Sequence, residues 1–256
     1  MKIKFLGTSA AWPLPRLGCK CNICTSKDPK DTRGRTQVLI DGKVLIDAGP
    51  DTYSHLKNED ISKLEAILIS HEHPDHILGL WDLPHIYGRN ETGVNKINLY
   101  VTKPVLAGIR RVFNRDFGPI KPIIVAENQP FSIANAKVTY VPVVHGKTPA
   151  FAVKYKDGKI FTYIPDFNRI LPSQQTIIRH SHVLALDGSS LAKIGQGPGH
   201  ISIKDGIVIG KNLKAKKVYF IHIGHKTDTH QELENFLKQN SGPNFHTAFD
   251  GLTIDI

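Results

Sequence analysis

The stretch His71-Glu72-His73-Pro74-Asp75-His76 directly follows the apolar run Ala66–Ile69. That run predicts a buried strand, so the stretch occupies the loop at the strand's end. His71 and His73 point the same way in an extended segment, and Asp75 and His76 face a second point once Pro74 turns the chain. Imidazole and carboxylate groups are ligands for zinc, manganese, iron and similar divalent ions. The spacing therefore predicts a metal centre rather than a cluster of exposed loop histidines.

Outward from this stretch, short apolar runs alternate with helical patterns. Asp41-Gly42 and Asp157-Gly158 each separate two strand-like runs, which is a strong hairpin signal. Thr229 precedes a helical pattern and is expected to cap it. Hairpins mixed with strand–helix units predict an α/β layered fold, in which helices cover sheets. We expect one domain over residues 1–256.

Composition favours a globular chain in the cytoplasm. We find no secretory signal and no run near the ~18 apolar residues of a membrane span, so we expect no membrane association. The formal net charge is +10, which is typical of chains that bind phosphate esters or nucleic acid. The basic residues are spread along the chain, however, and a generally lysine-rich composition explains them equally well.

Three cysteines, Cys19, Cys21 and Cys24, lie in the middle of residues 7–35, which show neither strand nor helix periodicity. An odd, clustered set without an export signal argues against disulfides and for thiolates that bind a metal. A structural zinc usually takes four ligands, and His225 is a candidate for the fourth. Such a site would order a loop that lacks periodicity. Three free thiols are the alternative.

The His71-x-His73-x-Asp75-His76 pattern resembles the signature of the metallo-β-lactamase superfamily. Further residues match that superfamily's ligand set in order along the chain, each where an apolar run ends: Asp47, His145, Asp166 and His222. The resemblance implies an α/β fold, a four-layer αβ/βα sandwich, with two divalent ions in the active site. It implies one metal on His71, His73 and His145. It implies a second on Asp75, His76 and His222, with Asp166 bridging the two and Asp47 orienting the ligands from behind.

A narrower resemblance points to the PhnP-like subgroup, the phosphoribosyl cyclic phosphate phosphodiesterases. It rests on Cys19-x-Cys21-x-x-Cys24, on His225 three residues after His222, and on His200 between Asp166 and His222. It implies a structural zinc on the three cysteines and His225, and zinc or manganese in the active site. Asp75 and His200 are then the predicted catalytic residues, Asp75 as a metal ligand and His200 as the acid that protonates the leaving group. The predicted substrate is a small phosphodiester.

Two other functions stay open. A tRNA 3′-processing endonuclease shares the central motif and Gly7-Thr8-Ser9-Ala10, but the sequence shows no inserted RNA-binding arm and no clustering of basic with aromatic residues. Nucleic acid is therefore the second choice of partner. A non-hydrolytic protein of the pyrroloquinoline quinone (PQQ) pathway shares a similar cysteine loop, and the complete ligand set argues against it. A homodimer is also left open.

Overall fold

The computed structural model describes residues 1–86, 96–114, 118–192 and 199–256. Over these residues seven strands form each of two sheets. The first sheet has the spatial order β14 (Thr253–Asp255), β1 (Lys2–Gly7), β2 (Gln37–Ile40), β3 (Val44–Ile46), β4 (Ala66–Leu68), β5 (Ile97–Val101) and β6 (Ile120–Ile124). The second has the order β13 (Phe245–Thr247), β12 (Lys217–Ile221), β11 (Val183–Asp187), β10 (Lys159–Ile164), β9 (Thr148–Asp157), β8 (Ala136–His145) and β7 (Phe131–Ile133).

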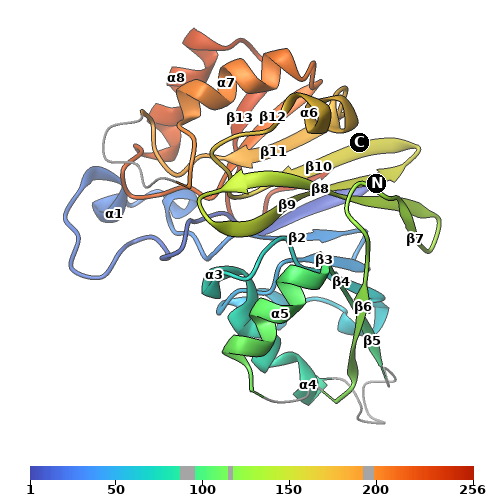
Figure 1. The fold of residues 1–256 in the computed structure, drawn as a ribbon. Coiled ribbons are helices and arrows are strands. Elements are labelled where there is room, and N and C mark those ends of the chain that lie inside the picture. The colour runs from blue at the N-terminus through green and yellow to red at the C-terminus, as the bar shows by residue number, and fades with distance from the viewer. Residues whose placement is uncertain (87–95, 115–117, 193–198) are drawn as a thin grey trace.

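Helices cover the outer faces of the two sheets. The α-helices are α1 (Asn22–Thr25), α2 (Thr52–Leu56), α3 (Pro74–Ile77), α4 (Leu83–Ile86), α5 (Lys103–Val112), α6 (Pro172–Ile178), α7 (Ile203–Asn212) and α8 (His230–Asn240). Short 3₁₀ turns are η1 (Pro29–Asp31), η2 (Ile61–Lys63) and η3 (Leu78–Trp81). Figure 1 shows α6, α7 and α8 over the second sheet, and α4 and α5 on the side of the first. This layering confirms the predicted αβ/βα sandwich. No helix among the described residues is long and apolar enough to cross a membrane.

Both sheets contain antiparallel and parallel strand pairs, and the turn sequences explain where the antiparallel hairpins form. The strands β2 and β3 form the antiparallel hairpin predicted at Asp41-Gly42, where both residues have positive φ. The strands β9 and β10 form the one predicted at Asp157-Gly158. From β3 to β6, and from β10 to β13, neighbours run parallel. Their carboxyl ends consequently share one edge of each sheet, where ligand sites of α/β folds form.

The parallel strands of the second sheet are buried on both faces. In β12, Tyr219 and Ile221 pack in the core between the sheets, while Phe220 packs under the helices. In β11, Val183 and Leu184 divide the same way. This alternation follows the period of two of a strand, and burial on both faces explains the continuous apolar runs in the sequence.

Residues 7–35 differ from the prediction because they contain α1 and η1. They are otherwise tied to the body by isolated bridges, including Leu14 to Arg33 and Ser9 to Ile223. Arg33 is almost fully buried and donates to Thr8 Oγ1 over 2.9 Å and to the Ala248 carbonyl. Tertiary hydrogen bonds therefore order a segment that has no periodic pattern of its own.

Candidate metal centre

The predicted ligands lie where strands of both sheets end. His71 follows β4, His145 ends β8, Asp166 follows β10 and His222 follows β12. The two sheets meet at this edge, because His71 pairs with Ala150 of β9 in an isolated bridge. Asp75 and His76 lie in α3, which begins at Pro74, a residue suited to the first position of a helix.

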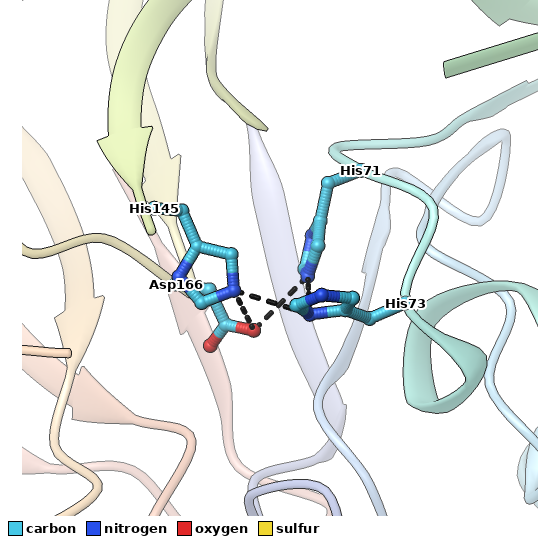
Figure 2. Close-up of side chains that lie close together, drawn as sticks. All are labelled: His71, His73, His145 and Asp166. Atoms are coloured by element: carbon cyan, nitrogen blue, oxygen red, sulfur yellow. Dashed lines mark hydrogen bonds and ion pairs between the residues drawn. The ribbon is translucent and has the colours of Figure 1, made fainter. Parts of the chain in front are cut away.

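Four side chains form the first cluster: His71, His73, His145 and Asp166. Their potential ligand atoms all lie within 4.8 Å of one another. His71 Nε2 is 3.1 Å from Asp166 Oδ2, and His145 Nε2 is 3.1 Å from His73 Nδ1. Figure 2 shows the three rings converging on the carboxylate. These are the residues predicted to hold one metal, and their role as ligands stays a prediction.

Asp166 also belongs to a second cluster with Asp75, His76 and His222, again within 4.8 Å. His222 Nε2 is 3.0 Å from Asp166 Oδ1, whereas His71 approaches Oδ2. His76 Nε2 is 3.1 Å from Asp75 Oδ2. The Oδ2 atom also lies 3.4 Å from His76 Nε2, so the second cluster contacts both oxygens of Asp166 and the first approaches Oδ2. A carboxylate shared by both clusters is the arrangement expected of the predicted bridging residue.

Two observations indicate that the clusters are suited to bind metal ions. First, buried His76 Nε2 and Asp166 Oδ1 make no well-aligned hydrogen bond among the described residues, although Asp75 Oδ2 and His222 Nε2 approach them to 3.1 and 3.0 Å. A bound cation would remove the cost of these unsatisfied buried atoms. Second, metal-binding histidines usually hold a polar partner on their other ring nitrogen. Four rings do so here: His71 on Ser70 Oγ (3.0 Å), His73 on Thr148 Oγ1 (3.0 Å), His76 on Asp47 Oδ2 (2.7 Å) and His145 on the Gly199 carbonyl (2.7 Å).

Asp47 organises the loop behind the clusters. Its carboxylate accepts hydrogen bonds from Ser70 N (2.7 Å), Ser70 Oγ (2.9 Å) and Tyr163 Oη (2.8 Å), besides its contact with His76. Asp47 and His222 both have positive φ, 63° and 56°. Such strain at non-glycine residues is found where surrounding contacts hold functional side chains in place.

The electrostatics favour neutral or anionic ligands at several positions. Burial, with His76 next in effect, lowers the pKa of His71 to about 4, so this ring is neutral at pH 7. Burial alone would raise the pKa of Asp75 and Asp166, but the neighbouring histidines outweigh it and hold both pKa values well below the ordinary range. Both carboxylates therefore stay ionised, as metal ligands must be.

His200 lies beside both clusters, with its ring stacked on His222 at a centroid distance of 5.4 Å. Its Nδ1 donates to Asp187 Oδ2 over 2.8 Å. Burial acts to lower the pKa of His200, but the hydrogen bond to Asp187 together with the charges of Asp187, Asp166 and Asp75 outweighs it, and the pKa rises to about 9. The sequence analysis missed Asp187. The signal was an acidic residue directly after the apolar run Val183–Leu186.

The three cysteines lie together, as predicted, with their sulfur atoms within 4.8 Å of one another. Burial raises the pKa of Cys24 to about 11, so a thiolate there needs a cation beside it. His225 Nδ1 is 3.6 Å from Cys19 Sγ, but its Nε2 is 2.7 Å from Arg16 Nη1. Arginine only donates, so this ring accepts at Nε2 and carries its proton on Nδ1. His225 as the fourth zinc ligand therefore stays a prediction and requires Arg16 to move.

The comparisons with known proteins agree with this geometry. Residues 43–223 match the Beta-lactamase superfamily domain. The chain belongs to the metallo-β-lactamase superfamily. A solved diphosphatase from the PhnP family is 31% identical and has a TM-score of 0.88 over 100% of this chain and 97% of that one. The likeness places the chain in the PhnP family and confirms the family predicted from sequence. The chain thus has the fold of a metallo-β-lactamase-type hydrolase, which implies divalent metal binding.

Three curated relatives with different names are similar to this chain. An octanoyltransferase of Porphyromonas gingivalis is 30% identical over 98% of this chain, which spans 51% of that protein. Coenzyme PQQ synthesis protein B of Methylobacterium radiotolerans is 25% identical over the full length of both. Ribonuclease Z of Methanococcus aeolicus is 29% identical over 80% of this chain and 56% of that protein. Superfamily membership alone therefore does not select a substrate.

Proposed function

We propose that the chain is a metal-dependent phosphodiesterase that hydrolyses a small cyclic phosphodiester such as phosphoribosyl cyclic phosphate. The observation that carries the proposal is the shared carboxylate of Asp166 between two His/Asp clusters, with His200 beside both. Two zinc or manganese ions bound by these clusters would supply an activated water at neutral pH and would withdraw charge from phosphoryl oxygens. Membership in the PhnP family supports the choice of a phosphate substrate.

The chain's own residues would divide the work by position. His71, His73 and His145 would hold one ion, and Asp75, His76 and His222 the other, with Asp166 between them. Asp47 would keep the His76 ring fixed through its Nδ1. His200 would hold a proton on Nε2 and pass it to the leaving oxygen, a step that positioned acids accelerate about 10²- to 10⁴-fold. The Cys19–Cys24 cluster would take a structural zinc.

A diphosphatase is the second candidate, because the 31% identical PhnP-family structure is that of a diphosphatase. The reaction also transfers a phosphoryl group to water, and the same two clusters suit it. The difference lies in the leaving group, which is a phosphate oxygen in a diphosphate and a sugar oxygen in a cyclic diester. A phosphate leaves more readily without a proton, so the second candidate depends less on His200.

One assay series tests these candidates. Purified protein with its measured metal content is given phosphoribosyl cyclic phosphate, bis-p-nitrophenyl phosphate, a nucleotide diphosphate ester and a precursor tRNA. We expect the highest kcat/KM on the cyclic phosphate. Preference for the diphosphate ester would select the second candidate, and cleavage of the tRNA alone would select the endonuclease. Two bound metals with no turnover of any substrate would favour a non-hydrolytic, PQQ-type role. The homodimer stays a prediction, and size-exclusion chromatography with light scattering would test it by measuring the mass in solution.

A further inference from the structure

The second sheet carries a basic surface at the strand ends that lie away from the two clusters. The parallel strands β10, β11 and β12 lead into the clusters where they end, so their first residues form the opposite edge of the sheet. For a strand of five residues such as β12, the two edges are roughly 15 Å apart. Exposed lysines begin two of these strands, Lys159 in β10 and Lys217 in β12. Other segments bring further cations to the same edge.

Sheet register and loop hydrogen bonds bring these cations together from distant parts of the sequence. Lys137 of β8 lies directly opposite Lys156 of β9, and Lys156 in turn pairs with Ile160 of β10. His182 N donates to the Ile160 carbonyl over 2.8 Å, and Lys217 N donates to the His182 carbonyl over 3.1 Å. We call the resulting set of cations the far-edge patch: Lys137, Lys154, Lys156, Lys159, Arg179, Lys214, Lys216 and Lys217.

Carboxylates do not compensate the charge of the far-edge patch. In the described part of the chain, the ion pairs made by lysine or arginine all join residues between 4 and 111, in the half built on the first sheet. None of those pairs involves the patch. Four segments form the patch: residues 136–139, 154–160, 179–182 and 213–217. They contain one acidic residue, Asp157, so most of the formal net charge of +10 gathers at this edge although the basic residues are spread along the sequence.

The pKa values of two side chains show that the cations lie close enough to act on their neighbours. Burial lowers the pKa of His182, and the charges of Lys216 and Lys159 lower it further. Burial also lowers the pKa of Lys154, and the charge of Lys156 adds to that effect. Like charges held this close repel one another, and a bound anion would relieve the repulsion.

The composition of the patch fits nucleic acid better than a protein or a lipid surface. Protein–protein interfaces are poor in lysine and have an apolar centre. Stable attachment to a membrane surface needs an apolar face or a lipid anchor beside the basic residues. None of the large apolar side chains exposed in the described part of the chain belongs to the four segments of the patch. Backbone phosphates require only cations, and interfaces with nucleic acid are polar and strongly positive.

We propose that the far-edge patch binds the phosphate backbone of a nucleic acid, independently of its base sequence. Neighbouring strands are ~4.8 Å apart, so the row of cations from β8 to β12 spans roughly 19 Å. A duplex strand places about five phosphates along that length. The proposal does not depend on the phosphodiesterase function, because the patch lies at the strand ends opposite the clusters and the bound nucleic acid is not cleaved there.

Salt-dependent binding of a labelled RNA tests the proposal. Fluorescence anisotropy with an RNA of about 20 nucleotides and mixed sequence should show an affinity that falls about 10²-fold between about 50 and about 200 mM salt, because bound phosphates release counterions. Lys214→Glu/Lys216→Glu/Lys217→Glu should weaken binding at the lower salt by at least about tenfold and flatten the salt dependence. Lys27→Glu/Lys57→Glu/Lys103→Glu is the matched control, an equal charge change at exposed lysines outside the patch, and should leave the affinity within about threefold.

Three outcomes would overturn the proposal. The first is a wild type that does not bind the RNA at the lower salt. The second is equal weakening in the two triple variants, which would make net charge the cause. The third is tighter binding to phosphatidylserine vesicles or to polyglutamate than to the RNA, lost in the patch variant, which would assign the patch to a lipid surface or an acidic protein. Circular dichroism of all three proteins should agree, and a wild type that hydrolyses no phosphodiester would refute the proposed function without changing these binding results.

Discussion

The paired His/Asp clusters and the Cys19–Cys24 cluster are built in opposite ways. The first stands on strand ends of two sheets, and three of its members, His71, His76 and Asp166, are 3% exposed or less. The second stands on a loop, where Cys19 and Cys21 are half-buried and only Cys24 is buried. The core therefore positions the first set of side chains before any metal binds. The tip of the loop contributes only Ile23 and Cys24 to the buried core beneath the helices of the second sheet, and we predict that a bound metal adds to its order.

The two ends of that loop, near Thr8 and Gly34, are its stems, and they make more hydrogen bonds to the body of the protein than its tip around Cys19–Cys24 does. Asp250 accepts from Thr8 Oγ1 over 2.7 Å and from Gly34 N, which are the first and last parts of residues 7–35. Arg33 lies buried beside them. The molecule thus shows a gradient from a buried sheet edge, through hydrogen-bonded stems, to a partly exposed tip that we predict to bind a metal. Four sets of substitutions test this gradient.

The largest effect is expected at the shared carboxylate. Asp166→Asn removes the charge that both clusters face and should lower kcat/KM about 10³-fold, or ~4 kcal/mol. The far-ultraviolet circular dichroism should not change, because the strands hold the other ligands. Metal analysis should show loss of at least one ion. Activity within tenfold of the wild type would remove Asp166 from the bridging role.

The support behind the clusters should matter next. Asp47→Ala leaves the donors of Ser70, His76 and Tyr163 without their acceptor and should lower the free energy of unfolding by ~3 kcal/mol. A matched pair sharpens the point. Tyr163→Phe and Tyr140→Phe each remove one hydrogen bond from a buried tyrosine, to Asp47 and to the Tyr100 carbonyl. Each should cost ~1 kcal/mol in urea unfolding. Only Tyr163→Phe should also weaken metal binding, by about tenfold, and equal metal affinity in both variants would contradict the proposed support.

The same contrast explains what could be predicted from sequence. The hairpins at Asp41-Gly42 and Asp157-Gly158 were predictable, and so was the position of the proposed ligands at strand ends, because each depends on a local pattern that the core preserves. Asp187 was missed because its proximity to His222 depends on the register of β11 against β12, which no local sequence pattern reveals. The turns α1 and η1 were missed because long-range bonds, such as those of Arg33, order that segment.

The stems should respond to pH through Asp250. Burial raises its pKa to about 6. A carboxyl group with a pKa raised on folding stabilises the fold fully below its unfolded value, near pH ~4, and this contribution is lost as the pH rises through about 6. Relative to Asp250→Asn, which does not titrate, the wild type should therefore lose ~2 kcal/mol of stability between about pH 4 and about pH 8. Urea unfolding of both proteins at the two pH values measures the difference. A constant difference would mean that the carboxyl group is not buried as the structure places it.

The smallest effect on global stability is expected at the tip, where the contact of Arg16 with His225 would compete with the predicted zinc binding. A ring that binds zinc through Nδ1 carries its proton on Nε2 and cannot accept from a guanidinium. Arg16→Ala should therefore tighten zinc binding by the cysteine cluster severalfold, while His225→Ala weakens it at least tenfold. In both variants thermal unfolding should shift by less than ~2 °C, because the tip opens locally while the sheets stay folded. Hydrogen exchange of residues 16–26 with and without zinc reports that opening. Tightened binding would show that the loop closes around a cation by exchanging one partner of His225 for another, whereas unchanged affinity in both variants would leave the cysteines without their predicted fourth ligand.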